Sequence, residues 1–200
     1  MRSGIRSRLL LTRLLGVFVL LLVLSSASQW TVRGPEHVAQ WLFTAGAVLA
    51  VVGFGGRIWA LCHIGGRKKR QVVRSGPYAV CRHPLYLFSL VGGLGLVLST
   101  QRLTIAAIYV AGCALLMPMA IRIEEAYLEH RFDDYADYRA SVPALVPRWR
   151  RVRGEAVTID LRLLARGVFD ATVFLSPLWL LSVIAELQQG GVMPFLLVLP

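Results

Sequence analysis

Charged residues are scarce in this sequence. Only 16% of its 200 residues are Asp, Glu, Lys or Arg, whereas 56% are apolar. Soluble globular domains carry about 25% charged residues and roughly 45–50% apolar ones. The apolar residues also stand in long blocks and not in short periodic runs. This composition excludes an ordinary soluble domain and indicates that lipid surrounds most of the chain.

Cysteines are few, and they form no recognisable pair. Cys62, Cys81 and Cys113 contain no C-x-x-C motif, and their odd number does not suit a disulfide framework. Cys62-His63 and Cys81-x-His83 do not match a familiar spacing of zinc ligands. The sequence therefore predicts no disulfide and no metal site.

A dinucleotide-binding fingerprint is also missing. Gly53, Gly55 and Gly56 have the wrong spacing for G-x-G-x-x-G, and they lie in an apolar run that no strand precedes. No part of the sequence has the pattern of a Rossmann half. A nucleotide-like cofactor would have to be held by helix ends and loops at the membrane surface.

Long apolar segments are what the sequence does contain. A helix that crosses a bilayer needs about 20 apolar residues, with roughly 17 as the lower end. Five segments meet or approach this length: Leu9 to Ala27, Val38 to Gly56, Pro84 to Thr100, Leu103 to Ile121, and Gly167 to Leu187. Only Gln101 and Arg102 separate the third from the fourth, which predicts a tight antiparallel hairpin. We therefore predict an all-α, polytopic membrane protein with about five transmembrane helices in one domain, residues 1–200.

The two ends of the chain need separate comment. The first apolar segment also resembles a cleaved signal peptide, because a basic start precedes the apolar core Leu14 to Leu24 and the small residues Ser25 to Ser28. We interpret it as a retained anchor, and either interpretation lets the second span enter from outside. The last apolar piece, Val192 to Pro200, is too short to span.

The basic residues are distributed unevenly between the two sides of the predicted bundle. All of them except Arg33 and Arg102 lie in the N-terminal segment, between Arg57 and Arg82, or between Arg122 and Arg166. Short cytoplasmic loops retain Lys and Arg, so these three segments are predicted to face the cytoplasm. Basic residues beside spans meet anionic lipid headgroups, which accounts for the net charge of +11 without a nucleic-acid partner.

The first polar segment with chemical potential is GPYAVCRHPLY, Gly76 to Tyr86. Gly-Pro is typical of a turn, and Pro84 suits the first turn of the third span. The unpaired amides of a helix start attract a carboxylate or another anion, and Arg82 and His83 stand beside them. Taken one at a time, these residues would also be ordinary anchors at a membrane interface.

The second polar segment follows the fourth span and begins with EEAYL, Glu124 to Leu128. Two adjacent carboxylates at the mouth of a helical hairpin are costly if they face lipid, but they are well placed to bind a cation. The alternative is a solvated amphipathic tail in which Tyr135 and Tyr138 pack on the membrane.

Together the two segments resemble the isoprenylcysteine carboxyl methyltransferase family and, more loosely, its phospholipid N-methyltransferase relatives. The likeness covers about Val51 to Pro147, and the ordered combination of RHPxY with a downstream glutamate pair carries it. The predicted span at about 167–187 lies beyond the family pattern. The resemblance implies a helical membrane enzyme whose S-adenosylmethionine site is a cytoplasmic pocket capped by the C-terminal segment.

The resemblance also implies roles for individual residues. The expected contacts with S-adenosylmethionine are His63, Arg70, Gln71, Val72, Val73, Tyr78, His83, Pro84, Leu85, Tyr86 and Glu124. The resemblance also implies that Glu125 supports the cofactor. Apart from the resemblance, we expect Arg122 to hold an acceptor carboxylate, whereas an amine acceptor would lose its proton to Glu125 or His83. These residue types suit the cofactor, since its sulfonium and amino groups favour carboxylates and aromatic faces.

Two departures from the family pattern bear on the site. Phe88 stands where many members have glycine, and its bulk would narrow the cofactor pocket. Ala120 occupies the position where the carboxyl methyltransferases have an acceptor-binding arginine, and Arg122 is the nearest arginine.

The function that these observations favour is methyl transfer from S-adenosylmethionine to the carboxylate of a lipophilic, isoprenylcysteine-like acceptor, with membrane lipid as the surroundings. A carboxylate is already ionised at neutral pH and needs no base. N-methylation of a phospholipid or another amine is the alternative within the family. A non-catalytic membrane scaffold whose polar segments dock partners is the alternative from another class.

Overall fold

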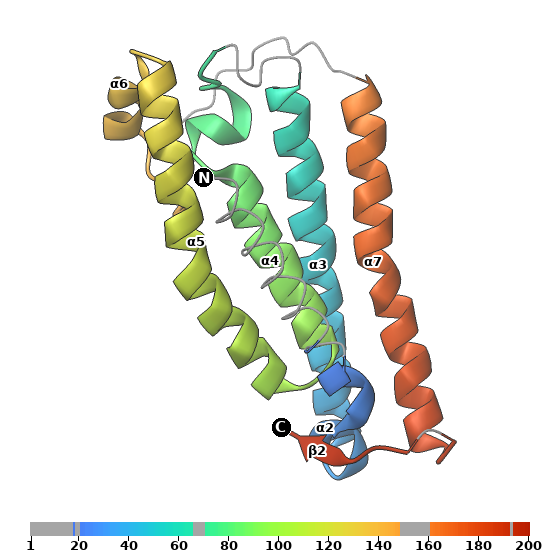
Figure 1. Ribbon diagram of the computed structural model, residues 1–200. Coiled ribbons are helices and arrows are strands. Elements are labelled where there is room, and N and C mark those ends of the chain that lie inside the picture. The colour runs from blue at the N-terminus through green and yellow to red at the C-terminus, as the bar shows by residue number, and fades with distance from the viewer. Residues whose placement is uncertain (1–17, 19–20, 66–70, 149–160, 193) are drawn as a thin grey trace.

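The computed structural model describes residues 18, 21–65, 71–148, 161–192 and 194–200. Four long helices run side by side: α3 (Glu36–Ile64), α4 (Pro84–Ser99), α5 (Leu103–Arg131) and α7 (Leu161–Gln189). The short elements are α2 (Gln29–Val32), the 3₁₀ turn η1 (Gly76–Ala79), α6 (Tyr135–Ser141) and the strands β1 (Ser26–Ser28) and β2 (Leu197–Leu199). Figure 1 shows η1 and α6 at one end of the bundle, and α2 and β2 at the other. The predicted all-α fold is confirmed.

Among the described residues, α3, α5 and α7 are long and apolar enough to cross a membrane. The apolar helix α4 has 16 residues and spans about 24 Å at 1.5 Å per residue, somewhat less than a hydrocarbon core of about 30 Å. Residues 1–17 and 19–20 lie outside the description, so the first predicted span is not described as a whole. The prediction that it runs to Ala27 is wrong, because Ser26 and Ala27 belong to β1 and pair with β2 instead of continuing a helix.

Two helices continue beyond the predicted spans, toward the end of the bundle that carries η1 and α6 (Figure 1). Helix α3 continues past Gly56 to Ile64, and α5 continues past Ile121 to Arg131. Neither extension contains proline, and the residues that follow Ile121 are mostly good helix formers. The intrahelical hydrogen bonds therefore carry His63 and the glutamate pair beyond the predicted apolar segments on rigid helices.

Helices α3 and α4 pack backbone to backbone through small residues. A side chain on Gly53 would collide with the backbone of Gly92, and one on Gly95 would collide with the backbone of Ala50. Such close contact is typical of membrane helices, where packing replaces the hydrophobic driving force between helices. The interface fixes where α4 begins relative to the end of α3.

The hairpin between α4 and α5 is as tight as predicted. Thr100, Gln101 and Arg102 connect the two helices, and Gln101 adopts the left-handed conformation with φ of 60°. Its carbonyl accepts a hydrogen bond from the Ser28 hydroxyl at 2.8 Å, and its side chain pairs with the Thr31 hydroxyl at 2.5 Å. These tertiary bonds hold a conformation that a non-glycine residue otherwise avoids.

The last described strand lies beside the first. The segment after α7 forms β2, which pairs in parallel with β1 so that Ser26, Ala27 and Ser28 lie opposite Leu197, Val198 and Leu199. Helix α7 packs on α3, where the rings of Phe54 and Phe174 stack at 5.1 Å. The piece predicted as too short to span is therefore a strand that closes one end of the bundle.

Candidate active site

The polar segment Gly76 to Tyr86 folds into a turn that lies against the end of α3. Gly76 has φ of 58°, and a side chain there would collide with the ring of His63. Glycine is the residue that takes this conformation without cost. Pro77 then sits in η1, and Pro84 begins α4 with its ring fully buried.

The segment after α6 holds this turn in place. The amide of Arg82 donates to the carbonyl of Pro143 at 2.8 Å, and the amide of His83 donates to Ala144 at 3.1 Å. The amide of Arg148 donates in return to Val80 at 3.1 Å. Two stretches sixty residues apart are thus joined by backbone hydrogen bonds, and Arg82 and His83 are presented toward α5.

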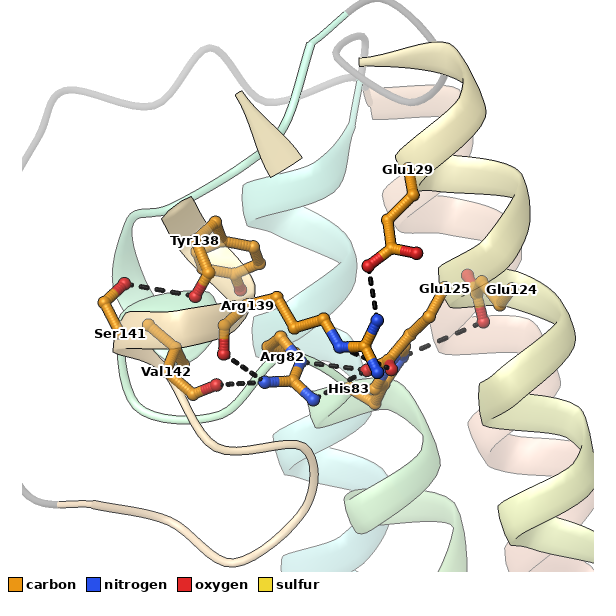
Figure 2. Close-up of polar contacts among 9 residues, drawn as sticks. All are labelled: Arg82, His83, Glu124, Glu125, Glu129, Tyr138, Arg139, Ser141 and Val142. Carbon is orange, nitrogen blue, oxygen red and sulfur yellow. Dashed lines mark hydrogen bonds and ion pairs between the residues drawn. The ribbon is translucent and has the colours of Figure 1, made fainter. Parts of the chain in front are cut away.

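Arg82 forms a buried ion pair with Glu125 of α5. Its Nε and Nη2 lie 2.9 Å and 2.8 Å from Oε1 of Glu125, and its Nη1 donates to the carbonyls of Arg139 and Val142. Figure 2 shows the guanidinium between α5 and α6. Glu125 is 6% exposed, and Arg139 approaches its other oxygen to 3.6 Å. This network connects the segment between η1 and α4 with α5 and α6.

His83 lies between the two adjacent glutamates. Its Nε2 is 3.0 Å from Oε1 of Glu125, whereas its Nδ1 is 3.9 Å from Oε2 of Glu124. The side chain of Glu124 is 43% exposed, against 7% for Glu125. The carboxylate of Glu125 is therefore neutralised inside the protein, while that of Glu124 remains available to another group.

A cavity of about 230 Å³ lies between these elements. This volume is just below the lower end of about 300 Å³ for pockets that hold drug-sized ligands. The described residues that line it are Ile64, Gln71, Val72, Val73, Tyr78, Arg82, His83, Glu124, Tyr127, Leu128, Phe132, Tyr135 and Tyr138.

Two tyrosine hydroxyls of this lining are buried without a hydrogen-bond partner in the described part of the chain. They belong to Tyr78 and Tyr135. Burial raises the pKa of Tyr135 to about 12, and it also raises the pKa of Tyr78. Both hydroxyls therefore stay protonated at neutral pH and have a proton to donate. Buried hydroxyls are normally paired, and these two unpartnered donors belong to residues of the cavity wall.

The lining suits S-adenosylmethionine by the chemistry of its groups. Glu124 supplies a carboxylate for a cation, and Tyr78, Tyr127 and Tyr135 supply aromatic faces. Val73 and Leu128 add apolar wall, and the unpartnered tyrosine hydroxyls can donate to the polar atoms of a nucleoside. The residues present fit the cofactor that the sequence motifs suggested.

Six of the predicted cofactor contacts line the cavity: Gln71, Val72, Val73, Tyr78, His83 and Glu124. Other predicted contacts lie near the cavity but are not among the described residues that line it. His63 packs under Gly76, Leu85 packs against the cluster of Val73 and Tyr78, and Pro84 begins α4. The ring of Tyr86 lies 5.6 Å from that of His83, and its hydroxyl is within hydrogen-bonding reach of Glu124. Arg70 lies outside the described residues.

The two residues predicted to be catalytic occupy different surroundings. Glu125 lies behind His83, paired with Arg82. Arg122 is exposed on α5 and is not among the described residues that line the cavity. Their roles in the reaction remain predictions.

Phe88 does not line the cavity within the described residues. Its ring instead fills the space over Gly56 of α3 and lies 6.2 Å from the ring of Trp59. A side chain at position 56 would collide with Phe88. Because Gly56 has no side chain, there is room beside it for Phe88, which stands in place of the family's glycine.

Sequence reasoning missed the aromatic wall on the C-terminal side of the site. Phe132, Tyr135 and Tyr138 all line the cavity, and the hydroxyl of Tyr138 donates to the carbonyl of Tyr78 at 2.6 Å. The signal was the spacing of three residues between Tyr135 and Tyr138, which places both side chains on one face of α6, whereas Phe132 ends α5 in an extended conformation. An amphipathic tail lying on the membrane explained the same spacing, so the pattern by itself did not indicate a pocket.

The nearby cysteine is not positioned for chemistry. Cys81 is 2% exposed, and burial raises the pKa of its thiol to about 11. It therefore stays protonated at neutral pH, whereas nucleophilic and metal-binding cysteines act as thiolates. In the ranges that the structure describes, no three His, Cys, Asp or Glu side chains gather in a way that would hold a metal ion.

Comparisons with known proteins agree with the geometry. The model of the phospholipid methyltransferase family matches residues 41–135, which include both polar segments up to the start of α6. The cobalt-zinc-cadmium resistance protein CzcN of Cupriavidus metallidurans is 36% identical over 182 residues, 90% of this chain and 81% of that protein. The nickel-cobalt-cadmium resistance protein NccN of Alcaligenes xylosoxydans xylosoxydans is 31% identical over 196 residues, 98% of this chain and 91% of that protein. No solved structure matches significantly.

Proposed function

Because the chain belongs to the phospholipid methyltransferase family, to which the isoprenylcysteine carboxyl methyltransferases also belong, we propose that it methylates the carboxylate of a lipophilic, isoprenylcysteine-like acceptor with S-adenosylmethionine. The observation that carries the proposal is the difference between the surroundings of Glu124 and those of Glu125. Arg82 and His83 neutralise Glu125, whereas Glu124 is 43% exposed at an aromatic cavity and has only the more distant Nδ1 of His83, at 3.9 Å, as a potential cationic partner among the described residues.

The residues of the chain would bind the cofactor, orient it toward the acceptor and exclude water from the site. When bound, S-adenosylmethionine supplies a methyl group on a positively charged sulfur, and its transfer to an oxygen leaves a neutral thioether. Glu124 would hold the cationic part of the cofactor, with Tyr78 and Tyr135 donating to its polar atoms. Positioning of this kind and a dry site are the main contributions of a protein to such a displacement.

The surroundings of Glu125 support a carboxylate acceptor. An amine acceptor must lose a proton before it can be methylated, which requires a base. Glu125 lies within 3.6 Å of three cationic or potentially cationic side chains, those of Arg82, His83 and Arg139. Such a carboxylate is a poor proton acceptor, because taking a proton would break the ion pairs. A carboxylate acceptor makes no such demand.

Arg122 is assigned to the acceptor and not to the cofactor. It precedes Glu124 by two residues, so the two side chains leave α5 about 200° apart. Its side chain is exposed on another face of α5, so in this proposal it attracts an anionic acceptor to the site and does not hold the reacting carboxylate, which must lie beside the methyl group in the cavity. An Arg122→Ala variant should raise the KM for the acceptor and leave the affinity for S-adenosylhomocysteine unchanged. An unchanged KM would remove Arg122 from the proposal.

N-methylation of an aminophospholipid is the second candidate. It is favoured by the description of the matching family and by Glu124, which within the described ranges has no ion pair shorter than 3.9 Å and would be a possible base. The two candidates predict different products from the same cavity, so the chemistry of the product separates them.

The decisive experiment supplies membranes containing the protein with methyl-labelled S-adenosylmethionine and either a prenylcysteine analogue or an aminophospholipid. Membranes with the Glu124→Gln variant serve as the control. We expect label on the prenylcysteine analogue that mild alkali releases as methanol, because methyl esters hydrolyse and N-methyl groups do not. Alkali-resistant label on the phospholipid would establish the second candidate. No labelled product from either acceptor would reject the proposed function.

The names of the relatives suggest a physiological setting. Both are named for resistance to divalent metals, cobalt and cadmium among them. We extend the proposal to methylation that contributes to metal resistance. In a metal-sensitive bacterium, expression of the natural chain should raise the tolerated concentration of cobalt or cadmium, and the Glu124→Gln variant should not. Equal protection by the natural chain and the variant would show that resistance does not depend on methyl transfer.

A further inference from the structure

A second cavity lies at the opposite end of the bundle from the candidate active site. Its volume is about 370 Å³, and polar side chains from β1, α2, α3, the α4–α5 turn and α7 line it, among them Ser28, Thr31, Thr44, Thr100, Arg102 and Gln188. This is the end at which Figure 1 shows α2 and β2. The length of α4, about 24 Å, separates it from the site built by His83. It is therefore a site of its own.

Arg102 is the unusual residue of this cavity. It is 4% exposed, and its Nη1 donates to the carbonyl of Thr100 at 2.8 Å. Its Nη2 donates to the carbonyl of Ser26 and lies 3.4 Å from Oε1 of Gln188. Its Nε has no hydrogen-bond partner in the part of the chain that the structure describes. Across the residues that the structure describes, no carboxylate lies within ion-pair distance of this guanidinium.

An unpaired buried cation calls for an explanation. Burial lowers the pKa of Arg102 to about 10, so the side chain is still charged at neutral pH. Charged groups are costly to bury unless an opposite charge compensates them. The three neutral oxygens around Nη1 and Nη2 belong to β1, the α4–α5 turn and α7, so Arg102 links these elements. Within the described residues, these oxygens leave the positive charge uncompensated and Nε without a partner.

We propose that this cavity binds an anionic group of the phosphate or carboxylate class, with Arg102 as its counter-ion. The hydroxyls of Thr31, Thr44 and Thr100 and the amide of Gln188 are hydrogen-bonding groups for the rest of a polar ligand. Glu186 is the acidic residue of the lining, and because it is exposed, solvent screens its charge more than that of the buried Arg102. The anion has two possible sources, a free small molecule or a lipid headgroup at the membrane surface.

Calorimetric titration of the purified full-length chain in a neutral detergent tests the proposal. One arm adds inorganic phosphate, and the other adds a short-chain phosphatidylglycerol. Saturable binding of phosphate identifies a free anion as sufficient, and binding of the phospholipid alone identifies a headgroup. Both results support the site. Absence of saturable binding in both arms overturns it.

Variants of the cavity localise the binding. Arg102→Gln removes the charge and should weaken the affinity at least tenfold. Because this arginine also holds β1 and α7, a second variant, Ser182→Met, fills the cavity and leaves Arg102 in place. Its matched control is Ser176→Met on the same helix, outside the lining; both hydroxyls donate only to carbonyls of α7 itself.

The expected result is at least a tenfold loss for Ser182→Met and unchanged affinity for Ser176→Met. If Arg102→Gln does not fold, the comparison of the two methionine variants decides alone. Equal affinity of these two variants would show that the anion binds elsewhere and would overturn the proposal.

Discussion

The adjacent residues Glu124 and Glu125 are chemically identical but have opposite surroundings. Glu125 is 7% exposed in its side chain and compensates the buried Arg82, whereas Glu124 is 43% exposed and faces the cavity. Successive helical positions point about 100° apart, so one turns toward η1 and the other toward the cavity. The same substitution at the two positions should therefore have different consequences.

We predict that Glu124→Gln weakens the binding of S-adenosylhomocysteine about ten- to hundredfold, because one charge-assisted contact is worth roughly 1.5–3 kcal/mol. Its unfolding temperature should stay close to that of the natural chain. Glu125→Gln should instead lower the free energy of unfolding by about 3 kcal/mol or more, since it leaves Arg82 as a buried unpaired charge. Titration and denaturant unfolding in detergent measure the two effects. Equal stability of both variants would contradict the assigned surroundings.

Two tyrosines of the cavity form a similar pair. The hydroxyl of Tyr138 donates to the carbonyl of Tyr78, while the hydroxyl of Tyr78 itself has no partner among the described residues. We predict that Tyr78→Phe leaves the stability unchanged and weakens cofactor binding several-fold, since only a ligand would use that hydroxyl. Tyr138→Phe should cost about 1–3 kcal/mol of unfolding free energy, because it strands a buried carbonyl. A loss of stability in Tyr78→Phe would show that its hydroxyl is paired inside the protein.

At the scale of elements, the contact between α3 and α4 is decisive, because it places the start of α4 and His83. Gly53 meets the backbone of Gly92, whereas a side chain on Gly55 would have no neighbour within 4 Å. We predict that Gly53→Ala destabilises the protein by about 1–3 kcal/mol through overpacking against an immovable backbone. Gly55→Ala should be neutral or stabilising by up to about 1 kcal/mol, as alanine favours the helix. Thermal unfolding of both variants in one detergent measures the difference, and similar shifts would contradict the packing.

At the scale of the whole molecule, the two ends of the bundle differ in chemistry. One end carries η1, α6 and the candidate active site, and the other carries β1, β2 and the cavity of Arg102. The positive-inside rule predicts that the first end faces the cytoplasm. In a cysteine-free background, Asp137→Cys should react with a membrane-impermeant thiol reagent only after the membrane is opened. Arg33→Cys should react in intact cells, and the reverse pattern would invert the predicted topology.

How much of the site could be predicted depends on the range of the interactions. The family resemblance carried by GPYAVCRHPLY and the glutamate pair implied that Tyr78, His83 and Glu124 belong to one site, and all three line one cavity. The roles of Arg82 and Arg139 were not predictable, because their partners are carbonyls and carboxylates brought close only by folding. The aromatic wall of α6 had two explanations from its spacing, and only its packing against Tyr78 chose between them.

The sequence by itself determined the membrane class, the extent of the apolar cores of the helices and the tight hairpin at Gln101, because these follow from local composition and chain connectivity. Tertiary structure decided which glutamate forms an internal ion pair, and that Ser26 to Ser28 pair with Leu197 to Leu199. It also decided that Arg102, predicted only as a loop residue, is buried beside a cavity. The reason is physical: burial and charge compensation depend on contacts between residues far apart in the chain, which a linear pattern does not specify.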